Sequence, residues 1–402
     1  MSSTKESAGV PVLLYAATAI ESMAYGAIFG LLAELQDAYG LPMYALGLIA
    51  GASSLAGLVA QLWLARYSDR GHTRLMLRLG LATAAAGMLM FALVSGMWLF
   101  VAARVLMGFG SGMFMPAVRR VVISKAGTRS GEELGRLASV EVGGFVSGAP
   151  IAALLAALFG LHAPFLVMAV ALVLTAPGLA RISEPPIAPN PPRRAVRTLI
   201  VRRGVRSGLA IGAALYLSIG VFDAVWARYL TDMGANTAVI AITLALFALP
   251  LVALSPFGGR IADRSGPVKS GVLALALTVP LIVAYGWVGS VALAAVIALL
   301  HAFTDAFTTP AGQAAVAHSS PPGLVAAGQG LYGAVAAGMA AISGFGAAPL
   351  YGIGGAKVMW SVAGGCVAVL ATLAWYWGRG SELDGAIAPT DELGNPGTDL
   401  AV

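Results

Sequence analysis

Four acidic residues interrupt long apolar runs, where a carboxyl group has little water around it. They are Glu21, Glu141, Asp223 and Asp305, and His301 precedes Asp305 by about one helical turn. A carboxyl group removed from water binds its proton more tightly and can exchange that proton near neutral pH. We therefore expect these residues to bind protons or a cationic substrate. A structural hydrogen bond or a buried ion pair is the alternative for each of them.

Arg104 is a basic residue within an apolar run. Gly108 and Gly112 follow it at i+4 and i+8, so the three residues share one face of a helix. A charged side chain among apolar neighbours in a membrane usually faces an aqueous cavity. We expect Arg104 to do so; the alternative is that its long side chain reaches the membrane surface.

The elements that carry these residues are membrane-spanning helices. The 402 residues are 58% hydrophobic and 10% charged, whereas a soluble domain carries about a quarter charged residues. A span needs about 20 mostly apolar residues, and helices satisfy their own backbone hydrogen bonds in lipid. Twelve such runs are present, at about 10–36, 43–65, 76–95, 97–117, 136–160, 163–182, 206–231, 238–258, 268–288, 290–312, 324–350 and 356–378.

The basic residues predict the orientation. Of 24 Lys and Arg residues, 21 fall on one side of the predicted spans; the exceptions are Arg104, Arg228 and Lys357. The positive-inside rule makes that side cytoplasmic, and an even number of spans then places both termini there. We expect a multi-pass protein of a cell membrane, such as a bacterial inner membrane. Charges distributed over inner loops argue against a nucleic-acid partner.

The chain is internally duplicated. Asp69 and Asp263 are 194 residues apart, as are Pro116 and Pro310, and both pairs occupy equivalent places in two hydrophobic halves. Parallel halves of this kind place a substrate site near the midplane between them. We predict a bundle over 1–182, a cytoplasmic linker over 183–205, a second bundle over 206–380, and a disordered tail over 381–402.

Asp69 and Asp263 each lie in a short basic loop between two spans. A carboxylate at this place can meet positive charge or a helix N-terminus in the other half and close the inner side. Arg70 and Arg74 in the first loop, and Arg264 in the second, would hold the loops in place. The alternative is a simple topology loop in which the arginines mark the cytoplasmic side.

These motifs resemble the major facilitator superfamily over nearly the full length of the chain. The loops are similar to its G-x-L-A-D-R-x-G-R-[KR] motif. Arg104 with its glycines is similar to its fourth-span motif, and this resemblance implies that Arg104 influences proton transfer. The fifth span resembles the antiporter signature G-x8-G-x3-G-P-x2-G-G at Gly135, Gly144, Gly148 and Pro150. It departs from that signature because Ala149 precedes the proline and alanines replace the last two glycines. The alternative for these glycines is generic close packing of helices.

The resemblance implies an all-α membrane fold of 12 transmembrane helices in two pseudo-symmetric six-helix bundles. On spans that would face the cavity stand seven aromatic or Met residues: Tyr25, Phe29, Met113, Phe145, Phe222, Trp226 and Tyr332. Ser130 and Glu133 have the spacing of a capping box at the start of the fifth span.

We therefore predict a secondary transporter of the 12-span drug:proton antiporter group. It would export small amphipathic or drug-like molecules by alternating access, as a monomer, with the proton as coupling ion and no other cofactor. The chain carries no P-loop, no metal-ligand cluster and no catalytic triad, so we do not expect an enzyme. An uptake or uniport carrier for a sugar, organic acid or other metabolite is the alternative. A sensor or scaffold of the same fold that has lost transport is a further one.

Overall fold

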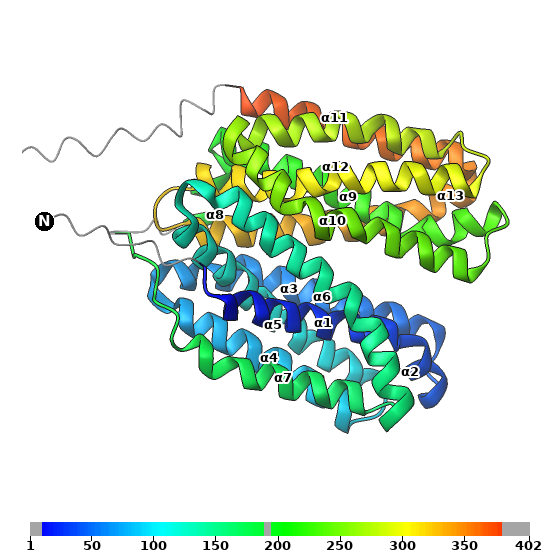
Figure 1. Ribbon diagram of the computed structural model, residues 1–402, viewed down its shortest axis with the longest axis horizontal. Helices are drawn as coiled ribbons and strands as arrows, with labels where there is room; N and C mark the ends of the chain where they lie inside the picture. The colour runs from blue at the N-terminus through cyan, green and yellow to red at the C-terminus, as the bar shows by residue number, and fades with distance from the viewer. Residues whose placement is uncertain (1–9, 189–193, 380–402) are drawn as a thin grey trace, which may run out of the picture.

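The computed structural model describes residues 10–188 and 194–379, and over these residues it is built from helices without strands. The helices form two bundles that lie side by side (Figure 1). Most of the predicted linker prolines, at 189–192, and the predicted disordered tail, 381–402, lie outside the described residues.

Six long helices form the N-terminal bundle: α1 (Val12–Gly30), α3 (Met43–Tyr67), α4 (Thr73–Leu93), α5 (Met97–Ala126), α6 (Ser130–Phe159) and α7 (Ala163–Leu179). The predicted first run, 10–36, is divided at Leu31, after which a short helix α2 (Leu32–Tyr39) follows. A turn, η1 (Ser68–His72), joins α3 to α4, and a turn, η2 (Gly127–Arg129), joins α5 to α6. Gly71 in η1 has φ +86°, a conformation that glycine adopts without strain.

Five helices form the C-terminal bundle: α9 (Arg203–Asp232), α10 (Thr237–Ser265), α11 (Pro267–Tyr285), α12 (Val291–Ser319) and α13 (Val325–Gly378). α13 contains two of the predicted spans, which are divided at Gly355, where φ is +65°. Within the described residues the twelve predicted runs therefore correspond to twelve helical segments, six in each bundle, and the predicted all-α fold is confirmed. The linker contributes the short helix α8 (Ala195–Ile200).

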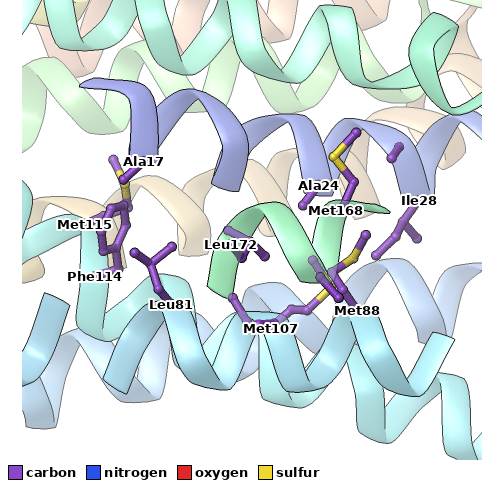
Figure 2. Close-up of a cluster of buried hydrophobic side chains, with 14 of the residues drawn as sticks. Ala17, Ala24, Ile28, Leu81, Met88, Met107, Phe114, Met115, Met168 and Leu172 are labelled. Carbon is purple, nitrogen blue, oxygen red and sulfur yellow. The ribbon is translucent and has the colours of Figure 1, made fainter. Parts of the chain in front are cut away.

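Each bundle has its own apolar core. In the N-terminal bundle, aliphatic and methionine side chains from α1, α4, α5 and α7 meet, among them Ile28, Met88, Met107 and Met168 (Figure 2). The core of the C-terminal bundle is more aromatic and includes Trp226, Tyr285 and Trp360. Aromatic rings provide large buried surfaces, and their hydroxyl and indole groups require polar partners. In the C-terminal core, the Tyr229 hydroxyl donates to the Tyr285 carbonyl oxygen at 2.6 Å.

We call the end of the molecule that carries η1, η2 and the α10–α11 connection the basic end. α8 lies at this end (Figure 1). α5 extends to Ala126, well past its predicted end at 117. Arg119 and Arg120 follow the predicted span 97–117 and were counted among the 21 loop charges. They lie in a helix instead and are only 6% and 4% exposed. The placement in a loop was wrong for both residues, because α5 continues past them. A buried arginine needs a partner inside the protein.

The two bundles pack most closely at the basic end and diverge away from it. A Cβ atom on Gly135 of α6 would overlap the Ser255 carbonyl oxygen of α10. One on Gly143, about two turns further from the basic end, would lie 3.8 Å from the nearest side chain of α10. Between α13 and α3 the same spacing grows from contact at Gly330 to 3.9 Å at Gly338. The halves are thus closed against each other at the basic end.

Candidate functional site

A cavity of about 530 Å³ lies between the two bundles, near the middle of the helices. Its wall combines acidic, aromatic and small side chains from both halves. The polar and aromatic lining residues are Glu21, Ser22, Tyr25, Gln61, Ser111, Arg119, Glu141, Phe145, Tyr216, Asp223, Phe247 and Tyr332. The two halves pack most closely on the side of the cavity nearer the basic end. A substrate would therefore reach the cavity from the opposite side.

Glu21 on α1 is a buried acid on this wall. It is 4% exposed, and the hydroxyl of Ser111 on α5 is its hydrogen-bond partner. Its Oε1 atom has no hydrogen-bond partner among the described residues. No arginine or lysine forms an ion pair with it in the described part of the chain, so this carboxyl group is free to take up a proton or to meet a cation from the cavity.

Glu141 on α6 lines the same cavity but is already paired. The Nη2 atom of Arg119 lies 3.4 Å from each of its carboxylate oxygens. The Nε atom of Arg119 has no partner among the described residues. Because the guanidinium neutralises Glu141, this acid fits the alternative of a buried ion pair considered from the sequence.

Asp223 on α9 is the third acid of the cavity wall. Asp223 is exposed, and its carboxylate forms no hydrogen bond or ion pair with other described residues. An acid at this place is accessible to a molecule that enters from the side opposite the basic end.

Arg104 does not reach the cavity wall. It is buried on α5, where its Nε donates to the Ile49 carbonyl oxygen at 3.0 Å. Its guanidinium carbon lies 5.0 Å from the ring centre of Tyr25 and 5.1 Å from that of Phe29. Cation–π contacts of this kind stabilise a buried cation. Arg104 therefore does not line the cavity itself but contacts Tyr25, which does.

His301 and Asp305 also lie outside the cavity wall. Both are on α12, within the C-terminal bundle, and both are at most 1% exposed. The cavity residue Phe247 contacts the imidazole of His301, with 5.6 Å between the ring centres. For these two residues to take part in proton coupling, as predicted, protons must reach them although neither residue contacts a substrate in the cavity.

The aromatic prediction separates into two groups. Tyr25, Phe145 and Tyr332 line the cavity. The other four predicted cavity residues do not line it: Phe29, Met113, Phe222 and Trp226. Phe222 stacks between Phe247 and Trp226 in the C-terminal core, with centroid distances of 4.4 and 4.3 Å, and Met113 packs against the N-terminal core.

The antiporter-like glycines lie where α6 crosses two other helices. A Cβ atom on Gly144 or Gly148 would overlap backbone atoms of α1, the helix that carries Glu21. Gly135 makes the equally close approach to α10 described above. Pro150 lies inside α6, which continues to Phe159. The glycines thus bring the backbone of α6 into contact with α1, which carries Glu21, and with α10 of the other half.

Asp69 contacts the N-terminus of α13, in the other half. Its two carboxylate oxygens accept hydrogen bonds from the backbone N–H groups of Ala326 and Ala327, at 2.9 and 2.8 Å. The Nε of Arg120 lies 3.1 Å from the same carboxylate. We call the contact of Asp69 with Ala326 and Ala327 the first latch. It places a negative charge at a helix N-terminus, where the helix dipole favours it.

Asp263 makes the equivalent contact in the opposite direction. It accepts hydrogen bonds from the N–H groups of Gly131 and Glu132, at 2.7 and 2.9 Å, at the start of α6. We call this contact the second latch. The predicted capping box at this helix start was wrong: no side chain of α6 caps its own N-terminus, and the Ser130 hydroxyl instead contacts His318 at 2.7 Å. Asp263 provides the cap from the other half.

The loop arginines do not cross between the halves. Arg70 and Arg264 are exposed, and Arg70 stacks only on the neighbouring Tyr67. Arg74 donates from its Nε to the Ile182 carbonyl oxygen at 2.6 Å. Glu184 accepts from the backbone N–H of Arg74 at 2.8 Å. Arg74 therefore joins its loop to the start of the linker.

Several residues of the site were not predicted from the sequence. Arg120 ion-pairs with Asp69, and Arg260 donates to Glu132 at 2.8 Å beside the second latch. Gln61 and Tyr216 line the cavity. The apolar run that continues past Pro116 to Val122 was a usable signal for the arginines, since it indicates that the helix extends around them. No local signal marks Gln61 or Tyr216.

The comparisons with known proteins agree with this architecture. The chain is 26% identical to the multidrug resistance protein MdtG of Dickeya zeae (strain Ech586) over 284 residues, 68% of this chain and 70% of that protein. It is 25% identical to MdtG of Klebsiella pneumoniae (strain 342) over 285 residues, 68% and 69% of the two chains.

Two solved structures have a similar fold. The human organic anion transporter MFSD10 (TETRAN) matches with a TM-score of 0.71 and 19% identity, over 92% of this chain and all of the other. The transporter FucP in the outward conformation matches with a TM-score of 0.73 and 16% identity, over 91% and 98% of the two chains.

Family models cover most of the chain. The Major Facilitator Superfamily model matches residues 14–225, and the MFS_1 like family model matches residues 136–362. Together with the twelve helical segments, these matches extend over both bundles. The chain is a multi-pass membrane transporter and belongs to the Major Facilitator Superfamily.

Proposed function

We propose that this transporter exports small amphipathic molecules, of the size and character of drugs, in exchange for protons. The observation that carries the proposal is Glu21, a buried carboxyl group on the cavity wall without an ion-pair partner in the described part of the chain. Such a group can hold a proton or bind a cationic substrate, but not both at once. Competition of this kind couples the movement of one to the movement of the other.

The rest of the cavity supports a substrate with an apolar body and a positively charged group. Phe145, Phe247 and Tyr25 offer aromatic faces to the apolar part. Arg119 neutralises Glu141, which leaves Glu21 and Asp223 as the acids open to a cation. Aromatic faces also attract cations directly.

The orientation of the molecule supports export. The positive-inside rule assigns the basic end to the cytoplasm, so a cavity closed at that end faces outward. In the proposed cycle, protons enter from outside, displace the substrate from Glu21, and are released to the cytoplasm after the latches open. The similarity to bacterial proteins named for multidrug resistance and the antiporter-like glycines support this direction and a bacterial inner membrane. One chain contains both halves of the cavity, which supports a monomer.

Flux measurements in proteoliposomes test the proposal. A pH gradient is imposed across vesicles that contain the purified protein, and the movement of ethidium is followed. We expect the gradient to drive ethidium against its concentration. We expect Glu21→Gln to lower this driven flux at least about tenfold, because a charge-assisted contact contributes ~1.5–3 kcal/mol. Glu34→Gln, at an acid of α2 outside the cavity wall, is the matched control.

Two outcomes would replace the proposal by its alternatives. Accumulation of a sugar or organic acid inside the vesicles, with ethidium unmoved, would select the uptake carrier. Absence of any transport, together with a change of conformation on ligand binding, would select the sensor. Ethidium flux that ignores the pH gradient would remove proton coupling and leave export.

A further inference from the structure

A second buried acid in the C-terminal bundle has no partner. Asp305 is 0% exposed, and neither of its carboxylate oxygens has a hydrogen-bond partner among the described residues. Its nearest charged neighbour is His301, one turn earlier on α12, whose Nε2 lies 3.7 Å from Oδ2 of Asp305. No arginine or lysine forms an ion pair with Asp305 within the described part of the chain.

The surroundings of this pair are polar but uncharged. The Ser218 hydroxyl of α9 lies 2.9 Å from Nε2 of His301, and the Tyr285 hydroxyl of α11 lies 3.2 Å from Nδ1. Hydroxyl groups thus occupy both nitrogens of the imidazole, and neither reaches Asp305. The titratable groups that face the pair are Tyr216 of α9 and Tyr285 of α11; α10 contributes the ring of Phe247.

An ionised carboxylate cannot remain in this place without compensation. Burial of an unpaired charge costs several kcal/mol even after the protein relaxes, and the group avoids this cost when it binds a proton or a cation. Of the acids discussed above, Asp69 and Glu141 each have an arginine partner, whereas Glu21 on the cavity wall has none among the described residues. Asp305 has no arginine partner within the described part of the chain. Its carboxyl group therefore avoids the cost of an unpaired buried charge only when it binds a proton or another small cation.

A thin wall separates this site from the cavity. Phe247 lines the cavity on one side and contacts the ring of His301 on the other. Tyr216 also lines the cavity and interacts electrostatically with Asp305. The rings of Phe247 and Phe222 thus separate the cavity from the imidazole of His301.

We propose that Asp305 and His301 form a proton-binding site, separate from the substrate cavity, that is occupied while the basic end is closed. Asp305 holds the proton, and His301 accepts it in transit between Asp305 and water. The inference rests on the proposed function, because it adds a second coupled proton to the one that competes with substrate at Glu21. An O–H bond of hydronium breaks as an N–H bond of His301 forms, and that N–H bond breaks as the O–H bond of the Asp305 carboxyl group forms, so only a proton is transferred.

Infrared difference spectroscopy of the full-length protein in lipid nanodiscs tests proton binding directly, without transport. During a pH titration, the carbonyl band of a buried, protonated carboxyl group should appear in the wild-type protein. Asp305→Asn should remove this band, and Glu21→Gln should leave it. His301→Gln should keep the band and shift the midpoint of its titration.

Two results would overturn the inference. One is that the carbonyl band remains unchanged in Asp305→Asn. The unfolding temperature of the variant must show that it is folded. The other is a response of the Asp305 band to NaCl at constant pH, which would identify a sodium site.

Transport stoichiometry then tests the coupling. In vesicles, the ethidium gradient that balances a given pH gradient gives the number of protons per substrate. We expect Asp305→Asn to lower this number from about two to about one, with Glu21 still intact. An unchanged ratio would refute coupling through Asp305. If the wild-type protein shows no proton-driven flux at all, the proposed function fails, while the infrared result on Asp305 stands separately.

Discussion

The first and second latches join the two bundles with the same hydrogen-bond pattern but in different surroundings. Each aspartate accepts from two consecutive backbone N–H groups at the N-terminus of a helix in the other half. Asp69 is 1% exposed and has Arg120 as an ion-pair partner. Asp263 is partly exposed, and no arginine or lysine within the described residues forms an ion pair with it. The nearby Arg260 pairs with Glu132 instead.

The two duplicated loops thus share the hydrogen-bond geometry of the latch but differ in how strongly each latch stabilises the closed basic end. The second loop matches the family motif more closely, yet the first latch has the stronger electrostatic environment. A charge that is buried with its partner is expensive to leave unpaired, whereas a partly exposed charge can be replaced by water. We therefore expect the first latch to determine how firmly the basic end is closed.

Neutralising the two aspartates should give the largest effect and an unequal one. Asp69→Asn leaves Arg120 buried without its partner and should destabilise the closed basic end by about 3–5 kcal/mol. Asp263→Asn should cost only about 1–2 kcal/mol. The measurement is the distribution of distances between spin labels on cysteines at Arg78 and Lys269, in a Cys366→Ser background.

Asp37→Asn, at an exposed acid of α2, is the control and should leave these distances unchanged. Equal opening by the two latch variants, or greater opening by Asp263→Asn, would contradict the ranking of the latches.

Adding side chains at the two helix crossings should have a smaller effect. Gly135→Val would overlap the Ser255 carbonyl oxygen, and the clash should cost the closed state about 1–3 kcal/mol. Gly330→Val meets the Gln61 carbonyl oxygen at 2.7 Å and should open the basic end to a lesser degree. Gly143→Val, where the nearest atom is 3.8 Å away, is the matched control. Opening by the control as large as by Gly135→Val would show that the crossing is not the cause.

Removing the arginine of the first latch should have a moderate effect that depends on Asp69. Arg120→Gln leaves both backbone hydrogen bonds to Asp69 in place, so we expect a cost of about 1–2 kcal/mol. The double variant Asp69→Asn with Arg120→Gln should open no further than Asp69→Asn, since no unpaired buried charge remains. Additive costs in this double-mutant cycle would mean that Arg120 acts through other contacts, such as its hydrogen bond to Pro186.

The exposed loop arginines should have the smallest effect. Arg70→Gln and Arg264→Gln remove exposed charges that form no ion pair or hydrogen bond with the described residues of the other half, so each should change closure by less than about 0.5 kcal/mol. The same label distances provide the measurement. A shift as large as that of Asp263→Asn would restore the role that the loop motif implied for these arginines.

The sequence predicted the parts of the fold that depend on composition and on repeated spacing. Long apolar runs can only be helices in lipid, and a constant offset between loops places Asp69 and Asp263 at equivalent points. Glu21 could be selected because an acid within an apolar run is rare. The donors that meet Asp69 could not be identified, because the N-terminus of α13 is brought to it only by the packing of the two bundles.

Most of the wrong predictions concerned which face of a membrane helix points toward the cavity and which toward the core of its bundle. Phe222 and Trp226 were expected in the cavity but pack in the C-terminal core. Lipid is as apolar as a protein core, so a membrane helix lacks the polar stripe that marks the outside of a soluble helix. Arg119 and Arg120 were misplaced for a related reason, since an arginine near a membrane surface has the same appearance whether it lies in a loop or pairs with a buried acid.

Proton release on substrate binding is the most direct test of the claim that proton and substrate compete at Glu21. Ethidium is mixed with the purified protein in weakly buffered solution near neutral pH, and a pH-sensitive dye records the protons that appear. We expect the wild-type protein to release protons as ethidium binds, and Glu21→Gln to bind ethidium with less release or none. Saturable binding to the wild-type protein without release, or equal release from the variant, would contradict the account.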